Sequence, residues 1–225
     1  MRILFNALIF LFEKIQTICY PQCCLLCGKQ HKKNICPECQ KEINKNINVI
    51  VKKYKEREIY YDKHIYFFKY EDIIRNKIID YKFNDKSYLY KLFSEIIIKN
   101  KKVFGILKSY DIIIPVPIHK KRKKERGYNQ CELITNDIAK YLELKSENNN
   151  LIKIKNTVPQ SSLDKVQRIQ NTKNVYKVLE KDKILNKNII LFDDIYTTGN
   201  TVNECSKILK ENGAKKILVF TIAKD

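Results

Sequence analysis

A stretch of fourteen residues, NIILFDDIYTTGNT at positions 188–201, constrains the fold more than any other part of the chain. Its four apolar residues at 189–192 form a run that is too short for a helix and does not alternate with polar residues. That pattern predicts a strand of a parallel sheet that is covered on both faces. Because such strands carry ligand sites at their carboxyl ends, we expect an α/β protein with a site at Asp193 and Asp194.

The residues around this acidic pair predict a cradle for a phosphorylated sugar. Adjacent carboxylates repel each other unless hydroxyls, a metal ion or water lie between them, and a sugar diol or a Mg2+-bound sugar phosphate would relieve the repulsion. A helical pattern begins at Val202, and helix N-termini favour phosphate groups. Between the acidic pair and this helical pattern lies a turn of small residues in which the glycine is free to take a positive φ. The turn consists of Thr197, Thr198, Gly199, Asn200 and Thr201.

The cysteines predict a separate metal-binding module at residues 18–48. Cys24, Cys27, Cys36 and Cys39 have the spacing C-x2-C-x8-C-x2-C, which lets four thiolates converge on one structural Zn2+. Disulfides fit a reducing cytoplasm poorly, and a redox motif would need only one pair. Two alternatives stay open, because Cys23 could replace Cys24 and Cys19 could also join the site.

The first twelve residues are apolar apart from one arginine and one asparagine. A secretory signal would be followed by a small-residue cleavage site, but Glu13 and Lys14 follow here. The run is also too short to span a bilayer as a helix. We expect an N-terminal helix over residues 1–17, buried against the body or, alternatively, lying on a membrane surface. No transmembrane span and a cytoplasmic location are therefore expected.

Residues 58–225 are expected to form one α/β domain, preceded by a charged linker at 50–57. A pair of short strands is predicted within 58–70. Apolar residues at helical spacing then predict two helices, a hood over about 70–100 that breaks near Asn84 and Asp85. Lys82 and Phe83 at this break could line a substrate site. Further strands are predicted after Leu151 and at 217–223.

A basic segment follows a second predicted buried strand, DIIIPVP at 111–117. Its cations, including Arg122 and Arg126, are expected in a loop that could bind pyrophosphate, although a run of lysines is often only a solvated surface. A helix is predicted over 129–142. The formal net charge of +19 raises the question of nucleic-acid binding, but only six of the 44 basic residues are arginine.

Four segments in this order resemble the ComF family of competence proteins. They are CLLCG with CPEC, IPVPIHKKRKKERGYNQCELI, NTVPQSSLDKVQRIQNTKNVYKV and IILFDDIYTTGNT. The last also resembles the phosphoribosyl pyrophosphate (PRPP) motif of type I phosphoribosyltransferases, with Tyr196 in place of the usual aliphatic residue. The likeness covers residues 4–223 and implies a double zinc ribbon fused to a phosphoribosyltransferase-like domain, in proteins linked to DNA uptake during natural transformation.

The resemblance also implies roles for individual residues. It assigns Asp193 and Asp194 to the ribose hydroxyls and the turn at 197–201 to the 5-phosphate. It places the KKERGYNQ segment on the opposite wall, through Arg122, Glu125, Arg126, Gly127, Asn129 and Gln130. Thr157, Gln160, Arg168 and Asn171 match family positions without an assigned role.

Three functions are compatible with these patterns. The first is a Mg2+-dependent phosphoribosyltransferase that stabilises departing pyrophosphate electrostatically, with Glu125 or His119 as candidate general bases. The second is an accessory factor that binds PRPP without turnover and engages single-stranded DNA or a competence helicase. The third is a zinc-containing interaction protein with a degenerate pocket.

Overall fold

The computed structural model describes residues 22–47, 49–54, 56, 58–157 and 174–225. The chain divides into two compact units, residues 1–46 and 47–225. The N-terminal helix expected over 1–17 lies outside the described residues, as do Cys19, Gln160, Arg168 and Asn171. Within the described part of the chain, no helix is long and apolar enough to cross a membrane.

The described part of the first unit consists of a cysteine-bearing loop and one helix, α2 (Pro37–Asn46), which begins directly after Cys36. Gly28 adopts a left-handed conformation with φ +79°, and its N–H donates to the Cys24 carbonyl at 2.8 Å. This turn brings the chain back after the first cysteine pair. A short bridge between Cys23 and Gln30 closes the loop.

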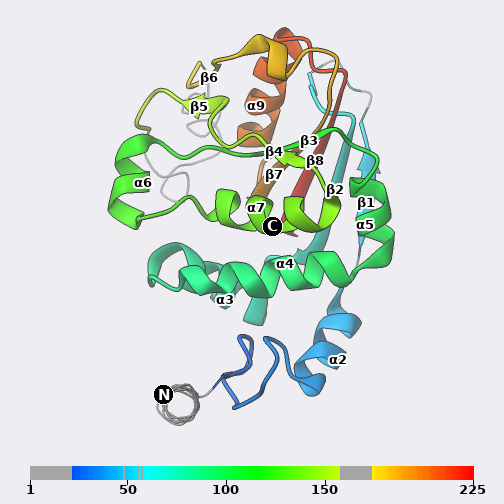
Figure 1. The fold of residues 1–225 in the computed structure, drawn as a ribbon, viewed down its shortest axis with the longest axis vertical. Coiled ribbons are helices and arrows are strands. Elements are labelled where there is room, and N and C mark those ends of the chain that lie inside the picture. The colour runs from blue at the N-terminus through cyan, green and yellow to red at the C-terminus, as the bar shows by residue number, and fades with distance from the viewer. Residues whose placement is uncertain (1–21, 48, 55, 57, 158–173) are drawn as a thin grey trace, which may run out of the picture. The chain divides into compact units, whose positions relative to one another are not determined.

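The second unit is built on a six-stranded sheet with strand order β1-β2-β8-β7-β3-β4 (Figure 1). All neighbouring strands pair in parallel except β1 and β2, which are antiparallel. The predicted α/β class with a mostly parallel sheet is therefore confirmed. The strands are β1 (Ile50–Lys53), β2 (Lys63–Lys69), β3 (Ile112–Pro115), β4 (Lys145–Ser146), β7 (Asn188–Tyr196) and β8 (Lys216–Lys224).

Helices cover both faces of this sheet (Figure 1). On one face, alternate residues of β7 such as Ile189 and Leu191 share a core cluster with Val202 and Cys205 of α9. Helix α7 packs on the other face against β3 and β7, with α4 beyond it. Among the described residues of this unit the helices are α3 (Asp72–Phe83), α4 (Tyr90–Lys99), α5 (Lys101–Leu107), α6 (Lys120–Arg126), α7 (Gln130–Leu142) and α9 (Asn200–Glu211), with short 3-10 turns η1 (Ser87–Leu89) and η3 (Lys181–Lys183).

A second, two-stranded antiparallel sheet is formed by β5 (Leu151–Lys153) and β6 (Tyr176–Val178). β6 packs against α9, so this sheet lies on the α9 side of the main sheet. The predicted strand after Leu151 is confirmed, and the predicted last strand at 217–223 is β8.

Three local predictions need correction. The expected linker at 50–57 contains β1, an edge strand whose residues are mostly exposed and so leave no apolar pattern to read. The expected pair of strands within 58–70 is the single strand β2, which pairs with β1 and β8 instead of with a neighbour in that segment. The basic segment expected as a loop is largely the helix α6, which is capped by the His119 ring.

The prediction of two helices with a break near Asn84 and Asp85 is confirmed: α3 and α4 are separate helices, and the break contains Asp85 in a left-handed conformation with φ +52°. The helix predicted at 129–142 is also confirmed as α7, with Ile134, Ile138 and Leu142 on its buried face. Leu133 of the same helix is only half-buried.

Candidate functional site

A pocket of about 440 Å³ opens in the second unit, where β3 and β7 end. Most of the predicted site residues line it, although they come from separate elements that include α3, α6, α7, β7 and the turn that leads into α9. Four of the predicted residues that the structure describes, Glu125, Gly127, Asn129 and Thr198, are not part of the lining. The predicted residues in the lining are Lys82, Phe83, His119, Arg122, Arg126, Gln130, Thr157, Asp193, Asp194, Thr197, Gly199, Asn200 and Thr201.

The acidic pair lies inside β7 rather than after it, because this strand continues to Tyr196. β8 stays paired with β7 to the end, whereas β3 leaves it at Phe192, whose carbonyl accepts from the Val116 N–H at 2.8 Å. At the acidic pair β7 therefore keeps β8 as a partner but no longer β3, and both aspartates line the pocket.

Asp194 is nearly buried, with 4% of its side chain exposed, and both of its oxygens have partners. Lys82 Nζ lies 2.8 Å from Oδ1, and Gln130 Nε2 donates to Oδ2 at 3.1 Å. Arg126 in turn donates to Gln130 Oε1. Two helices, α3 and α7, thus neutralise and orient this carboxylate, and a ligand that needs Asp194 must share it with Lys82.

Asp193 has a different environment. Its Oδ1 accepts from the Asp194 N–H at 2.9 Å and lies 3.7 Å from Cys131 Sγ. Burial, followed by the neighbouring Asp194 carboxylate, raises the pKa of Asp193 to about 7. Burial and the Asp193 charge also raise the pKa of Cys131, which keeps its thiol a donor. Asp193 is therefore the carboxylate of the pair that lacks a cationic partner of its own at hydrogen-bond distance among the described residues.

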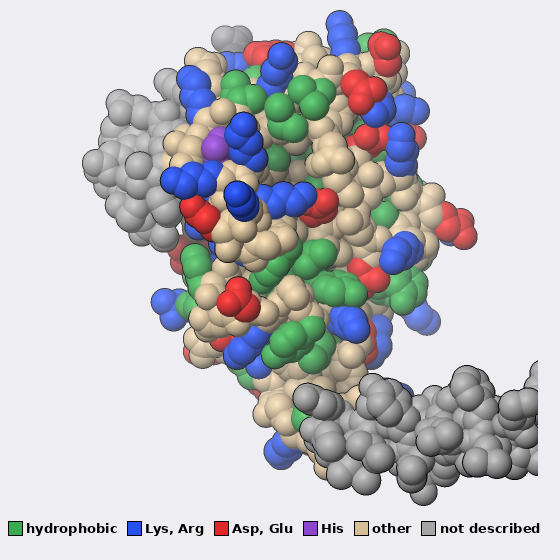
Figure 2. Space-filling view, turned by 60° about the vertical axis from the view of Figure 1, so that its left-hand side comes forward, with side chains coloured by type: hydrophobic (Ala, Val, Ile, Leu, Met, Phe, Trp, Pro, Cys, Tyr) green, Lys and Arg blue, Asp and Glu red, His purple; other side chains and the backbone are tan. Residues whose placement is uncertain are grey.

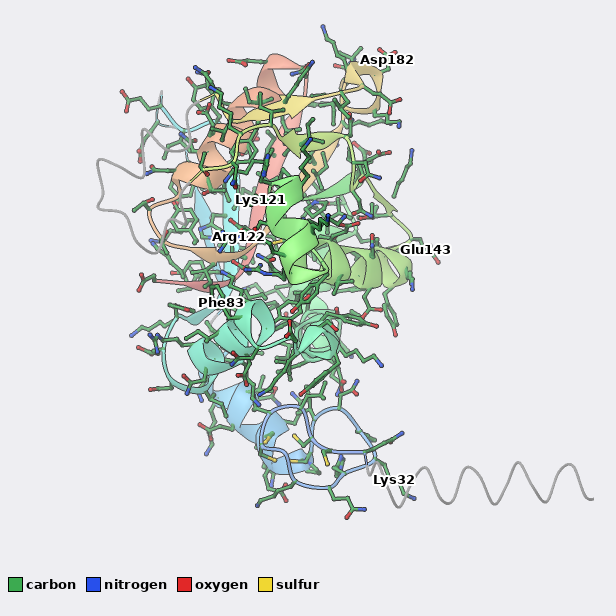
Figure 3. All side chains as sticks on the ribbon, turned by 90° about the vertical axis from the view of Figure 1, so that its left-hand side faces the viewer. Lys32, Phe83, Lys121, Arg122, Glu143 and Asp182 are labelled. Carbon is green, nitrogen blue, oxygen red and sulfur yellow. The ribbon has the colours of Figure 1, made fainter. Side chains whose placement is uncertain are left out.

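The hood contributes an apolar edge beside this charge. Phe83, the last residue of α3, is 59% exposed at the pocket, and the Arg126 guanidinium lies 5.5 Å from its ring centroid. Figure 3 shows Phe83 at the end of α3 and Arg122 on α6, on the face that carries the pocket. Burial, followed by the charge of Arg122, lowers the pKa of Arg126.

The turn after β7 contains the predicted glycine with a positive φ. Gly199 has φ +79° and directly precedes α9. Asn200 Nδ2 is buried and has no hydrogen-bond partner in the described part of the chain, and the same holds for the hydroxyls of Thr198 and Thr157. Buried polar groups of this kind need partners, so a ligand with several acceptor oxygens would satisfy Asn200 and Thr157, which line the pocket.

Several lining residues were not predicted. Lys153 at the end of β5 lies 5.9 Å above the ring of Tyr176 in β6, and burial, followed by Arg122, lowers the pKa of Lys153. Tyr70, Arg75, Asn156 and Asp225 also line the pocket. Nothing local distinguishes Lys153 from the many other lysines of this chain; only the fold brings it to the site.

The two candidate general bases are placed differently. His119 lines the pocket, but its Nδ1 accepts from the Lys121 N–H at 3.3 Å and so caps α6. Glu125 is exposed and does not line the pocket. Asn129 has a structural role, because its side chain accepts from the Cys131 N–H and donates to the Val116 carbonyl.

The outer face of α6 is strongly basic. Lys120, Lys121, Lys123 and Lys124 are exposed, whereas Arg122 of the same helix lines the pocket. Figure 2 shows Lys and Arg side chains gathered on this face of the molecule.

The first unit holds a second candidate site. The sulfurs of Cys24, Cys27, Cys36 and Cys39 all lie within 4.8 Å of one another. Figure 3 shows sulfur atoms gathered in this unit. The Cys36 N–H donates to Cys24 Sγ at 3.3 Å, as expected of a knuckle that stabilises a thiolate. Cys23 is exposed and outside this group, and the His31 ring interacts with the backbone of Lys33. The four-cysteine cluster could hold a zinc ion.

The Lys82–Asp194 pair gives a first prediction. Lys82→Met should destabilise the second unit by about 3 kcal/mol, because it leaves a nearly buried carboxylate without its counter-charge. Lys86→Met is the matched control: Lys86 pairs with Asp80 at 2.9 Å, but its side chain is 41% exposed, and a much smaller effect is expected. Urea unfolding at pH 8 measures both. Equal losses of unfolding free energy in the two variants would show that the buried ion pair stabilises the protein no more than the exposed one does.

Comparisons with known proteins were made for the whole chain, and no family model matches it. It is 28% identical to competence protein F of Haemophilus influenzae over 220 residues, which cover 89% of this chain and 96% of that protein. Competence protein ComFC of Streptococcus pneumoniae is 26% identical over 202 residues, 89% and 80% of the two chains. DNA utilization protein YhgH of Escherichia coli K12 matches at 27% over 114 residues, about half of each chain.

Among solved structures, adenine phosphoribosyltransferase from Thermoanaerobacter pseudethanolicus matches with a TM-score of 0.38 and 15% identity over 83% of this chain and 99% of that one. Purine phosphoribosyltransferase from Pyrococcus horikoshii matches with a TM-score of 0.40 and 12% identity, covering 62% and 85%. Glutamine PRPP amidotransferase from B. subtilis matches with a TM-score of 0.39 and 16% identity; the match covers 59% of this chain and 25% of that longer one.

The two relatives that align over most of this chain, each over 89% of it, are both named as competence proteins. The chain is a homologue of competence protein F and ComFC along most of its length.

Proposed function

We propose that the protein binds PRPP together with Mg2+ in a role in natural competence. One observation carries the proposal: two carboxylates, a glycine turn at a helix N-terminus and a set of cations open on the same pocket. These cations are Arg75, Lys82, Arg122, Arg126 and Lys153. Carboxylates suit sugar hydroxyls, and the turn and cations suit phosphate groups.

The ribose would lie over the acidic pair. Asp193 can accept from a ribose hydroxyl, and Asp194 is held ready by Lys82 and Gln130. The 5-phosphate would lie at the turn, where Asn200 Nδ2 is a buried donor without a partner among the described residues. One phosphorylated pentose would therefore use both groups at once.

The pyrophosphate would face the arginines of α6. Arg122 and Arg126 present planar donors to this side of the pocket, and two linked phosphates need several cations to offset their charge. Asp193 fits a hard cation such as Mg2+, which prefers oxygen ligands and commonly binds through one or two carboxylates and the phosphates of a substrate. When bound, Mg2+ would supply charge stabilisation for the departing pyrophosphate.

We further propose that the first unit binds one structural zinc ion through its four clustered thiols. Three of them, Cys24, Cys36 and Cys39, are buried, and the loop that carries them is closed by backbone hydrogen bonds such as that from the Leu25 N–H to the Asn34 carbonyl at 2.7 Å. Four reduced thiols are expected in a reducing compartment such as the cytoplasm.

A second candidate function is favoured by the exposed lysines of α6. Lys120, Lys121, Lys123 and Lys124 form a basic surface next to the pocket, which suits the phosphate backbone of single-stranded DNA or an acidic partner such as a helicase. In this function the protein would bind PRPP as a signal and not turn it over.

Calorimetry with the purified full chain, PRPP and Mg2+ tests the proposal. We expect saturable binding of PRPP that weakens when Mg2+ is removed, and weaker binding of ribose 5-phosphate and pyrophosphate given separately. Pyrophosphate release in the presence of candidate bases would identify a phosphoribosyltransferase. PRPP binding without release, combined with salt-dependent binding of single-stranded DNA, would favour the accessory function. Absence of heat with all three compounds would refute a PRPP site.

A further inference from the structure

The phosphate turn rests directly on an aromatic side chain. Gly199 lies so close to the Tyr196 ring that a Cβ at position 199 would come within 2.6 Å of Cζ of that ring. Tyr196 itself is half-buried and lines the pocket. The ring is therefore a spacer between the end of β7 and the turn that follows it.

The Tyr196 ring is held from behind by residues of β2 and the segment before it. The His64 ring stacks on it with centroids 4.3 Å apart, and the Tyr61 and Tyr196 hydroxyls are hydrogen-bonded at 2.9 Å. His64 is completely buried and bonds Thr221 of β8 through Nε2 at 2.9 Å. These contacts fix both the plane of the Tyr196 ring and the direction of its hydroxyl.

Lys224 completes this arrangement on the strand side. Its Nζ lies 5.5 Å from the Tyr196 ring centroid. Burial, followed by the charges of Lys224 and Lys52, lowers the pKa of His64 to about 3, so the stacked imidazole stays neutral near pH 7. The stack therefore keeps one form over the range in which the pocket would bind phosphates.

We infer that Tyr61, His64 and Tyr196 form an aromatic bracket that sets the position of the phosphate turn, and that Tyr196 is a positioning residue for the 5-phosphate. The inference rests on the proposed PRPP site, and it adds residues whose role is to hold the turn in place. A turn whose amides are already aimed at one point binds phosphate more tightly than one that must be ordered, because the ordering cost is met before binding. An aliphatic residue at position 196 would have neither the ring that stacks on His64 nor the hydroxyl that bonds Tyr61.

A pair of substitutions tests the steric contact. Gly199→Ala should weaken PRPP binding by about 30-fold, since the new methyl group must displace the ring or the turn. Adding Tyr196→Leu should recover a large part of this loss. When Tyr196→Leu is already present, Gly199→Ala should weaken PRPP binding only about threefold, and this remainder comes from the positive φ at position 199. Gly127→Ala measures that backbone cost through the unfolding midpoint, because Gly127 has φ +82° and nothing within 4 Å of the new methyl group.

A second variant tests the anchor without changing the turn. Tyr61→Phe keeps the ring but removes the hydroxyl partner, and we expect about fivefold weaker PRPP binding with no further loss when Tyr196→Phe is added. Amide hydrogen exchange at 197–201 should accelerate in Tyr61→Phe, while exchange in the centre of β8 stays at the wild-type rate.

The exchange measurement separates the two proposals. If the wild-type protein binds no PRPP, the proposed function fails, but faster exchange of the turn in Tyr61→Phe would still support the bracket. Unchanged exchange in Tyr61→Phe, or a Gly199→Ala defect that Tyr196→Leu does not reduce, would overturn the bracket even if PRPP binds.

Discussion

Asp193→Asn is expected to weaken PRPP binding by about 100-fold while leaving the free energy of unfolding unchanged or slightly increased. The binding loss follows from two charge-assisted interactions, with a ribose hydroxyl and with Mg2+, that together contribute about 3 kcal/mol. Stability should not fall, because burial and Asp194 raise the pKa of Asp193 to about 7. A neutral amide at position 193 removes the repulsion between the two neighbouring carboxylates. Calorimetry and urea unfolding on the same preparation measure both quantities.

Asp182→Asn is the control for a general charge effect. Asp182 is exposed in η3 and does not line the pocket, so this variant should bind PRPP like the wild type. Asp194→Asn is expected to weaken binding as well, but it also removes the partner of Lys82 and should lower stability. If Asp193→Asn binds PRPP with wild-type affinity, the carboxylate does not contact the ligand and the proposed orientation of the ribose is wrong.

The contrast between these two aspartates shows which features the sequence could predict. The strand, the turn and the helix that follow one another at 188–211 depend on local pattern, and they were predictable from apolar runs and one glycine. The partners of Asp194 were not, because Gln130 is 64 residues away and Lys82 reaches the site only through the packing of α3. Lys82 could be suspected only from its position at the break in the hood.

Two of the three errors, those at β1 and α6, have a common physical origin. β1 is an edge strand with mostly exposed residues, so it lacks the alternation that burial imposes on a strand. α6 is short and has no buried residue, and its start is fixed by the His119 cap rather than by an apolar face. Lys153 reaches the pocket through pairing of β5 with β6, a contact between distant segments. Elements of the core were predictable because burial gives their sequences an apolar pattern. Elements without buried residues have no such pattern.

If the first unit binds zinc as proposed, removal of the metal is expected to unfold this unit and leave the second one folded. The described part of the first unit buries only a few apolar side chains besides its cysteines, among them Leu26, Ile35 and Ile43. Such a core does not hold a loop of this size, whereas four thiolates on zinc can supply about 10 kcal/mol or more near neutral pH. Metal analysis should give about one Zn2+ per chain, and a chelator should abolish amide protection in α2.

Cys36→Ser and Cys23→Ser form a matched pair for this prediction. Cys36 is buried within the four-thiol cluster, whereas Cys23 is exposed and outside it. The first variant should purify with little or no zinc and with an α2 that exchanges rapidly, and the second should keep both the metal and the protection. Because β7 and β8 belong to the other unit, their protection should stay at the wild-type level in both variants. Loss of zinc from Cys23→Ser together with its retention in Cys36→Ser would mean that the first cysteine pair is shifted by one residue and that the second is not a metal knuckle. A protein that carries no metal and still protects α2 would show that the cluster is held by packing alone.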